Sequence, residues 1–298
     1  MALLAGCGTP EDRDPHRPQA VPATPFEQHD REILDARVRY VDEGPRGAPA
    51  LLLIPGHTSR IEEYDALVPV LARHHRVLVM DFPGSGYASK PERDYHLAYY
   101  EDAAVALLDA LGVERAHLAG GSLGGNLVLR LAHRFPERFD RLAPWAPGSA
   151  WEASPRVARI MRALTSHAFF RPIVWIQSRF WYDESFAGRQ EALDRTFAYY
   201  REVMGPGFLR MYFGMAADQV ERSLFPLAPE IAHPVWLGWG DRDHGANMGQ
   251  GVARLHELLP RSELHVFEGA GHALATEVPE ALARSIDEFL RRPAHELP

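Results

Sequence analysis

The sequence predicts a mostly parallel, doubly wound α/β sheet with an inserted helical cap. Short apolar runs of strand length alternate with helical patterns in residues 31–147, and the same alternation resumes in residues 234–298. Between them, residues 148–233 interrupt this alternation and are helical in character. We therefore expect one sheet built from two separated parts of the chain, with the middle segment forming the cap.

Composition and charge narrow the range of partners and chemistries. The chain has 298 residues, 46% of them hydrophobic and 24% charged, which is typical of a soluble globular protein with a sizeable core. Its net charge of -8 argues against nucleic acid or an anionic membrane surface as a partner. Lys90 is the only lysine, which excludes lysine Schiff-base chemistry elsewhere, and Cys7 is the only cysteine, which excludes an internal disulfide.

The first 30 residues indicate a tether. They are polar and rich in proline, a composition that is typical of disordered linkers. Leu4-Ala5-Gly6-Cys7 resembles the lipobox of bacterial lipoproteins, although only six residues precede Cys7. A lipid-anchored protein of the bacterial cell envelope and a cytoplasmic protein both remain open, and no stretch is long enough to form a transmembrane helix.

The elements before the cap follow from apolar runs and turn residues. Alternation from about Glu32 predicts early strands, and later strands are predicted at 50–54, 77–80, 116–119 and 141–146. Ser59 and Glu62 have the spacing of a capping box, which predicts a helix to about His74. A further helix is predicted from about Leu97 to Leu111. Alternation of strand and helix implies parallel strands with helices on both faces.

The cap and the elements after it complete the chain. The cap holds 15 of the 30 aromatic residues and four of the seven methionines, so we expect an apolar inner face. Its basic residues are all arginine and are interpreted as solvated. The sheet resumes with strands at 235–239 and 263–267 and helices at about 249–259 and 279–290.

The segment from Val113 to Phe135 contains the strongest chemical motif. An apolar run enters Gly120-Gly121-Ser122-Leu123-Gly124, and leucines at helical spacing follow it. This G-x-S-x-G pattern between strand and helix predicts a sharp, strained turn that exposes the Ser122 hydroxyl. The helix N-terminus and the Leu123 N–H both favour negative charge there, which suits a nucleophile.

A serine nucleophile needs a general base, and the base needs a carboxylate that orients it. His272 follows the strand at 263–267, and Asp241 and Asp243 follow the strand at 235–239. Such partners are expected beyond the carboxyl ends of parallel strands. The chain order Ser, Asp, His differs from that of the chymotrypsin and subtilisin classes. Periodicity alone does not separate the two aspartates, which stand two residues apart.

From about Glu32 to Arg292 the chain resembles α/β-hydrolase-fold serine hydrolases with a helical cap. The matching segments are Pro55-Gly56-His57, Asp81-Phe82-Pro83-Gly84-Ser85-Gly86, Gly120-Gly121-Ser122-Leu123-Gly124, Trp239-Gly240-Asp241-Arg242-Asp243 and Gly271-His272.

The resemblance implies a role for each site residue. Ser122 would be the nucleophile, His272 the base and Asp243 the acid, since the family pattern W-G-x-x-D ends on Asp243. The backbone N–H groups of His57 and Leu123 would form the oxyanion hole, although Pro55-Gly56 stands where the family usually has His-Gly. Distance along the loop also favours Asp243 over Asp241, which we expect to accept backbone N–H groups.

The expected activity is hydrolysis of a carboxylic ester of an apolar small molecule through an acyl-enzyme. A carbon–carbon bond hydrolase and a proline aminopeptidase share this triad, although Leu123 stands where the aminopeptidases have Trp. A binding module on the same fold is the alternative of another class. Serine at the elbow argues against haloalkane dehalogenases and epoxide hydrolases, which carry aspartate there. No cofactor or metal is expected, because Asp241, Asp243 and His244 form at best a weak cluster and no dinucleotide fingerprint is present.

Overall fold

A computed structural model describes residues 23–244 and 248–298 of the chain, so Cys7 and most of the predicted tether lie outside the described residues. The described strands form one eight-stranded sheet in the order β1-β2-β4-β3-β5-β6-β7-β8. β1 and β2 pair antiparallel, as do β2 and β4, and all other neighbours pair parallel. The strands are β1 (His29–Ile33), β2 (Ala36–Glu43), β3 (Ala50–Ile54), β4 (Arg76–Met80), β5 (Ala116–Gly121), β6 (Phe139–Trp145), β7 (Val235–Gly240) and β8 (Ser262–Phe267).

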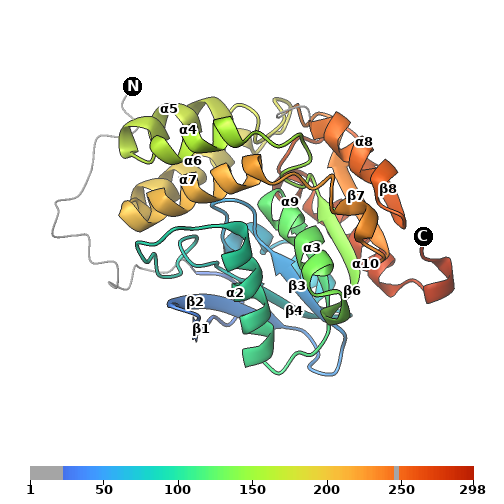
Figure 1. Cartoon of the computed structure of the whole chain (residues 1–298). Helices are drawn as coiled ribbons and strands as arrows, with labels where there is room; N and C mark the ends of the chain where they lie inside the picture. The colour runs from blue at the N-terminus through green and yellow to red at the C-terminus, as the bar shows by residue number, and fades with distance from the viewer. Residues whose placement is uncertain (1–22, 245–247) are drawn as a thin grey trace.

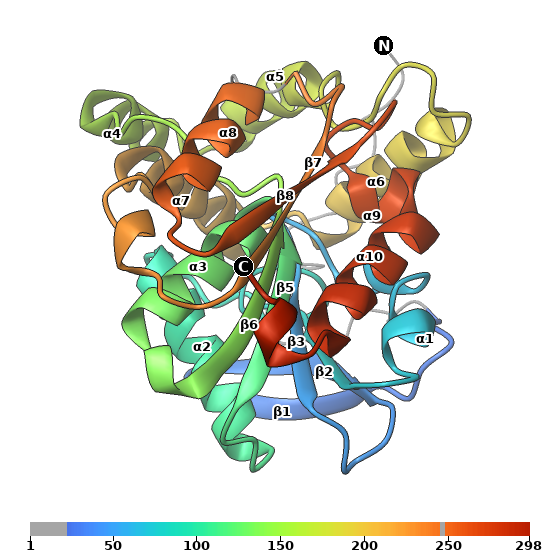
Figure 2. The same ribbon diagram turned by 90° about the vertical axis from the view of Figure 1, so that its right-hand side faces the viewer.

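Helices cover both faces of the sheet, as the doubly wound prediction requires (Figures 1 and 2). One face is covered by α2 (Leu97–Ala110), α3 (Leu123–Arg134) and α8 (Met248–Leu258), and the other by α1 (Val68–Leu71), α9 (Leu274–Glu277) and α10 (Pro279–Arg291). Each face has its own buried cluster, because side chains of successive strand residues point to opposite sides. Leu52 and Leu78 pack with the first set of helices, and Leu51 and Val77 pack with the second.

Four helices follow β6 and precede β7 in the chain, within the segment predicted as a cap. They are α4 (Pro155–Ala163), α5 (His167–Gln177), α6 (Arg189–Val203) and α7 (Pro206–Glu221). Both views place them at one end of the molecule, with β1 and β2 at the other end (Figures 1 and 2). None of the described helices combines the length and the apolar character needed to cross a bilayer.

The strands β3 to β8 and the helices α2, α3, α8 and α10 end within two residues of the predicted positions. The capped helix predicted between Ser59 and His74 is wrong, because this segment forms a 3-10 turn (Ile61–Tyr64) followed by the short α1. The Ser59 hydroxyl donates to Glu63 Oε2 (2.5 Å) instead of capping a helix, and the Ser59 carbonyl accepts from the Ser85 hydroxyl (2.9 Å). Contacts with a distant loop therefore override the local capping pattern.

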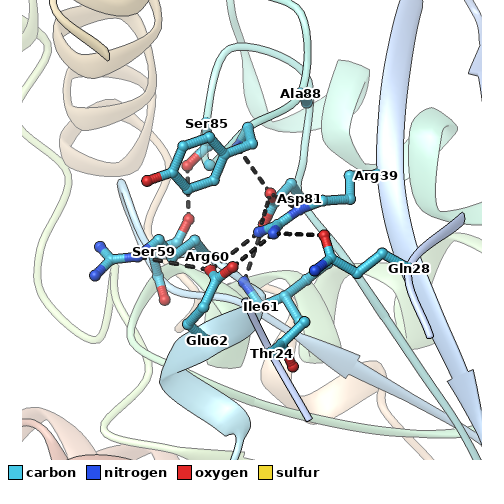
Figure 3. Close-up of polar contacts among 12 residues, drawn as sticks. Thr24, Gln28, Arg39, Ser59, Arg60, Ile61, Glu62, Asp81, Ser85 and Ala88 are labelled. Carbon is cyan, nitrogen blue, oxygen red and sulfur yellow. Dashed lines mark hydrogen bonds and ion pairs between the residues drawn. The ribbon is translucent and has the colours of Figure 1, made fainter. Parts of the chain in front are cut away.

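The loop after β4, which carries Ser85, is held by a buried ion-pair network centred on Arg39 of β2 (Figure 3). The Arg39 guanidinium donates from Nε to Asp81 Oδ2 (2.8 Å) and from Nη1 to Glu62 Oε1 (2.6 Å). Arg39 and Asp81 are almost fully buried, at 2% and 0% exposure. Asp81 also accepts the backbone N–H groups of Ile61 (2.9 Å) and Tyr87 (2.7 Å). One carboxylate thus fixes both the loop after β3 and the loop after β4.

Gly86 shows how tightly the loop after β4 encloses the Asp81 carboxylate. Its φ of +52° lies in the left-handed region, and a Cβ there would stand 2.1 Å from the Asp81 Cγ. No larger residue fits without moving Asp81 away from Arg39. The glycine noticed in the Asp81–Gly86 motif is therefore required by the buried carboxylate.

We expect Arg39→Met to lower the free energy of unfolding by about 3–5 kcal/mol, because it leaves the Asp81 charge buried without its partner. The exposed ion pair of Arg115 and Asp140 provides a matched control. Arg115→Met should cost less than about 1 kcal/mol. Urea unfolding of both variants measures the difference, and equal costs would show that the network does not stabilise the fold.

Candidate active site

Ser122 occupies the turn between β5 and α3 in a strained backbone conformation. Its φ of 56° and ψ of -117° lie outside the regions that side chains other than glycine usually adopt. The turn requires glycine on both sides, since a Cβ at Gly124 would lie 2.0 Å from the Ile54 carbonyl oxygen and one at Gly120 would lie 2.7 Å from it. The glycines predicted to make room for the turn are needed because the end of β3 passes directly against it.

Backbone hydrogen bonds hold the strained residue in place. The Ser122 N–H donates to the Trp145 carbonyl (3.0 Å), and the Ser122 carbonyl accepts from the N–H groups of Asn126 (3.0 Å) and Gly148 (2.8 Å). These partners lie on β6, on α3 and in the segment that leaves β6. The surrounding structure therefore determines the conformation of the turn, as such strain requires.

The structure brings two of the predicted catalytic side chains into direct contact. His272 Nδ1 and Asp243 Oδ2 are 2.7 Å apart, and the Asp243 side chain is fully buried. Ser122, Asp243 and His272 follow the carboxyl ends of β5, β7 and β8, which lie at one edge of the parallel part of the sheet. Among the described residues, Ser122 has no hydrogen bond to His272. In free enzymes this contact often forms only when substrate is bound.

Asp241 does not join this pair. It is exposed, and its Oδ1 accepts the N–H of Gly269 (2.7 Å) in the turn that leads to His272. This is the loop-stabilising role expected for it. The exposure of Asp241 lowers the stability cost expected from its loss, because solvent can replace the lost hydrogen bond.

The surroundings of His272 favour its charged form. Burial disfavours the imidazolium, but the charge of Asp243, the hydrogen bond to it and the charge of Glu277 outweigh burial and raise the pKa of His272 above its usual 6.5. The same interactions stabilise the imidazolium that forms when a base takes a proton from serine.

Glu277 of α9 is a residue that the sequence analysis missed. Its carboxylate accepts the N–H groups of Gly271 (3.0 Å) and Ala273 (3.2 Å), on either side of His272, and that of Asp183 (3.1 Å). The carboxylate thereby fixes the backbone on both sides of the base. The available signal was an acidic residue five positions after His272, close enough along the chain for its carboxylate to reach the N–H groups on either side of the base.

The loop after β3 lies against the nucleophile. A Cβ on Gly56 would stand 3.6 Å from Ser122 Cβ. Among the described residues, the backbone N–H groups of His57 and Leu123 have no hydrogen-bond acceptor, so both donors are available. Their sequence positions and this proximity agree with the predicted oxyanion hole, which we retain as a proposal.

The His57 side chain contacts the helices above it. Its ring stacks on Tyr212 of α7 with centroids 5.0 Å apart, and burial lowers the pKa of His57 to about 4, so the ring is neutral at neutral pH. Thr58, next to it, shares a 2.7 Å hydrogen bond with the Tyr200 hydroxyl of α6. Phe170 of α5 packs edge-on against both tyrosine rings. An aromatic cluster from three cap helices thus covers the loop beside Ser122.

No three metal-binding side chains gather into a possible metal site within the part of the chain that the structure describes. The two aspartates of the weak Asp241, Asp243 and His244 cluster have other partners. Asp243 is hydrogen-bonded to His272, and Asp241 accepts the N–H of Gly269.

Comparison with known proteins identifies the family. The model of the alpha/beta hydrolase fold family matches residues 49–277. This chain belongs to the α/β-hydrolase-fold family. It is a hydrolase by relationship, since it is 30% identical over 282 residues to the 2-hydroxymuconate semialdehyde hydrolase of Pseudomonas sp. (strain CF600), covering 87% of this chain and 93% of that protein.

The chain is also similar to a second curated hydrolase and to a solved structure. The 2-hydroxy-6-oxo-6-phenylhexa-2,4-dienoate hydrolase of Comamonas testosteroni is 26% identical over 281 residues, covering 88% of this chain and 94% of that protein. The crystal structure of the enol-lactonase from Burkholderia xenovorans LB400 superposes with a TM-score of 0.78 at 22% identity, over 89% of this chain and all of that chain. The structural likeness shows the shared fold.

We expect Asp243→Asn to reduce kcat by about 10²- to 10⁴-fold, because it removes the negative charge that orients and stabilises the His272 imidazolium. Asp241→Asn is the matched control and should keep nearly full kcat, since its carboxylate accepts the N–H of Gly269 in a turn and has no bond to His272 among the described residues. Both variants are compared by steady-state kinetics and melting temperature. If Asp241→Asn destroyed turnover at an unchanged melting temperature while Asp243→Asn stayed active, the assignment of the acid would be wrong.

The pH profile tests the His272–Asp243 interaction separately. A base must be neutral to accept a proton, so kcat/KM of the wild type should rise with pH through a pKa above 6.5. Asp243→Asn removes the charge that raises this pKa while burial still lowers it, so the rise should move to lower pH in that variant. The residual activity of Asp243→Asn and the activity of Asp241→Asn are measured across pH. An unmoved profile in Asp243→Asn would contradict the proposed coupling.

Proposed function

We propose that this hydrolase cleaves a carboxylic ester of an apolar small molecule through an acyl-enzyme on Ser122. The observation that carries the proposal is the combination of a strained elbow serine with a buried aspartate–histidine pair at the same edge of the sheet. Ester hydrolysis requires a nucleophile, a base, a residue that orients the base, and donors for the oxyanion. The described residues offer a candidate for each of these roles.

In the proposed reaction, Ser122 Oγ attacks the carbonyl carbon while His272 Nε2 accepts its proton. Asp243 holds the Nδ1 side of the ring, so that Nε2 is the free acceptor. The oxyanion of the tetrahedral intermediate binds the N–H groups of Leu123 and His57. His272 then donates the proton to the leaving alcohol. In the second half of the reaction, water attacks the carbonyl carbon of the acyl-enzyme while His272 accepts its proton. His272 returns this proton to Ser122 Oγ as the acid leaves.

The cap supports an apolar substrate. Tyr200, Tyr212 and Phe170 pack over the loop that carries His57, and they are at most 4% exposed. The packing beside the proposed oxyanion hole is therefore aromatic and largely apolar, which supports an apolar substrate over a charged one. The remaining polar atoms are paired within the protein, as in the 2.6 Å bond from the Tyr212 hydroxyl to Gln177.

Carbon–carbon bond hydrolysis is the second candidate, and the names of the similar proteins support it. The substrates named for the relatives, 2-hydroxymuconate semialdehyde and 2-hydroxy-6-oxo-6-phenylhexa-2,4-dienoate, contain neither an ester nor an amide. A hydrolase acting on them must break a carbon–carbon bond next to a carbonyl group. The same Ser122 attack serves that reaction, except that His272 donates its proton to the carbon atom of the leaving group.

We expect Ser122→Ala to lose at least about 10⁴-fold in turnover while keeping the fold, because the hydroxyl forms the covalent bond. A fluorophosphonate probe should label the wild type on Ser122 and leave Ser122→Ala unlabelled. Ser166→Ala is the matched control, since the Ser166 side chain caps no helix N–H. Labelling of Ser122→Ala at wild-type level would show that another residue is the nucleophile.

A panel of substrates distinguishes ester hydrolysis from carbon–carbon bond hydrolysis. Wild-type protein is assayed on p-nitrophenyl esters of graded chain length and on 2-hydroxy-6-oxo-dienoates, with Ser122→Ala as the blank. Higher kcat/KM on the longer esters supports the leading proposal, and higher kcat/KM on the dienoates supports carbon–carbon cleavage. Absence of turnover and of probe labelling would favour a binding module.

A further inference from the structure

Helix α5 exposes large apolar side chains that a solvated helix would not carry. Phe169 and Ile176 are seven residues apart and lie on one side of the helix, and Phe180 stands in the turn that follows it. Their exposed fractions are 46%, 53% and 48%. Trp175, on an adjoining stripe, is 57% exposed, and the Arg179 guanidinium lies 4.0 Å from its ring centroid.

Helix α4 carries the same kind of surface. Val157 and Ile160 are 45% and 59% exposed, and Ala158 is the only buried residue of this helix. In the described part of the chain, six of the eight exposed large hydrophobic side chains therefore lie on α4, on α5 or in the turn after α5. Both views place α4 and α5 at the end of the molecule that lies away from β1 and β2 (Figures 1 and 2).

The charge of this face is opposite to that of the whole protein. The chain carries a net charge of -8, but residues 153–182 contain five arginines and neither lysine, aspartate nor glutamate. Arg162 pairs with Glu221 of α7 (2.6 Å). The other four arginines are exposed and have no carboxylate partner among the described residues, and they are Arg156, Arg159, Arg171 and Arg179.

We propose that the cap face formed by residues 155–180 docks on an anionic lipid surface. Exposed Trp, Phe and Ile beside unpaired arginines are the combination by which interfacial helices bind anionic membranes, with apolar side chains entering the headgroup region and cations binding the phosphates. The overall negative charge argues against such a partner, but the local excess of arginine reverses that expectation for this face. Docking would place the cap, which covers the loop beside Ser122, at the membrane surface.

A second copy of the chain fits this face less well. In a symmetric dimer the same patch faces itself, so arginines of one copy would meet arginines of the other without intervening carboxylates. Like charges brought together in this way oppose association. A bilayer with phosphate headgroups complements both the charge and the apolar surface.

The test is flotation of the purified full-length chain with vesicles of phosphatidylcholine, alone or mixed with phosphatidylglycerol. All forms carry Cys7→Ala, so that no acyl chain on Cys7 contributes to binding. We expect binding to the mixed vesicles, and weaker binding at high salt. The double variants Ile176→Ser/Phe180→Ser and Arg171→Gln/Arg179→Gln should each lower the partition coefficient at least about tenfold.

The control is Leu34→Asn/Val266→Thr, which changes the two exposed large hydrophobic side chains that the described residues have outside this face. It should bind like the parent protein. Hydrolysis of a short soluble ester should be unchanged in all variants, which separates docking from folding and from the proposed activity. Equal binding to both kinds of vesicle, no binding at all, or unchanged binding in the α5 variants would overturn the proposal. So would a dimer in light scattering that the α5 variants abolish.

Discussion

The close approach of the Ile54 carbonyl to the turn at Ser122 is the constraint on which the site depends. The end of β3 leaves no room for a side chain at Gly124, and it carries the chain directly into the loop with Gly56 and His57. The strained serine and the loop that offers an N–H donor are therefore placed by one contact between adjacent strands. The Arg39–Asp81–Glu62 network holds the far side of the same loop, so that its position is fixed from both directions.

The sequence was sufficient for those parts of the fold and site that local pattern determines. Buried parallel strands such as Ala50–Ile54 are continuous apolar runs, and the glycines around Ser122 mark a turn that few other sequences can form. An aspartate after β7 is expected near His272 because both follow the carboxyl ends of neighbouring parallel strands, and the family pattern and the distance along the loop then favoured Asp243 over Asp241. These features required no knowledge of distant contacts.

Features that depend on distant contacts were not predictable in the same way. The capping pattern at Ser59 and Glu62 fails because both side chains bind other groups. Ser59 donates to Glu63, and Glu62 accepts from Arg39, which is 23 residues away. The role of Glu277 was not predicted because its three N–H partners come from two parts of the chain that are separated by almost 90 residues. The arginines of the cap look evenly spread along the chain, and only the structure shows that four of them, on α4, on α5 and in the turn after α5, are exposed without a carboxylate partner among the described residues.

The hydrogen bonds between the cap and the His272 loop limit how substrate can enter. The Ala273 N–H donates to the Trp181 carbonyl (3.0 Å), and Glu277 binds the N–H groups of both Asp183 and Gly271. The segment before α6 is therefore pinned to the backbone that carries the base. If the cap lifted as one rigid body, it would pull on that backbone and disturb the base in the open state. Any opening that admits substrate and leaves these bonds intact must keep the segment before α6 in place, so this segment is the fixed side of the entrance.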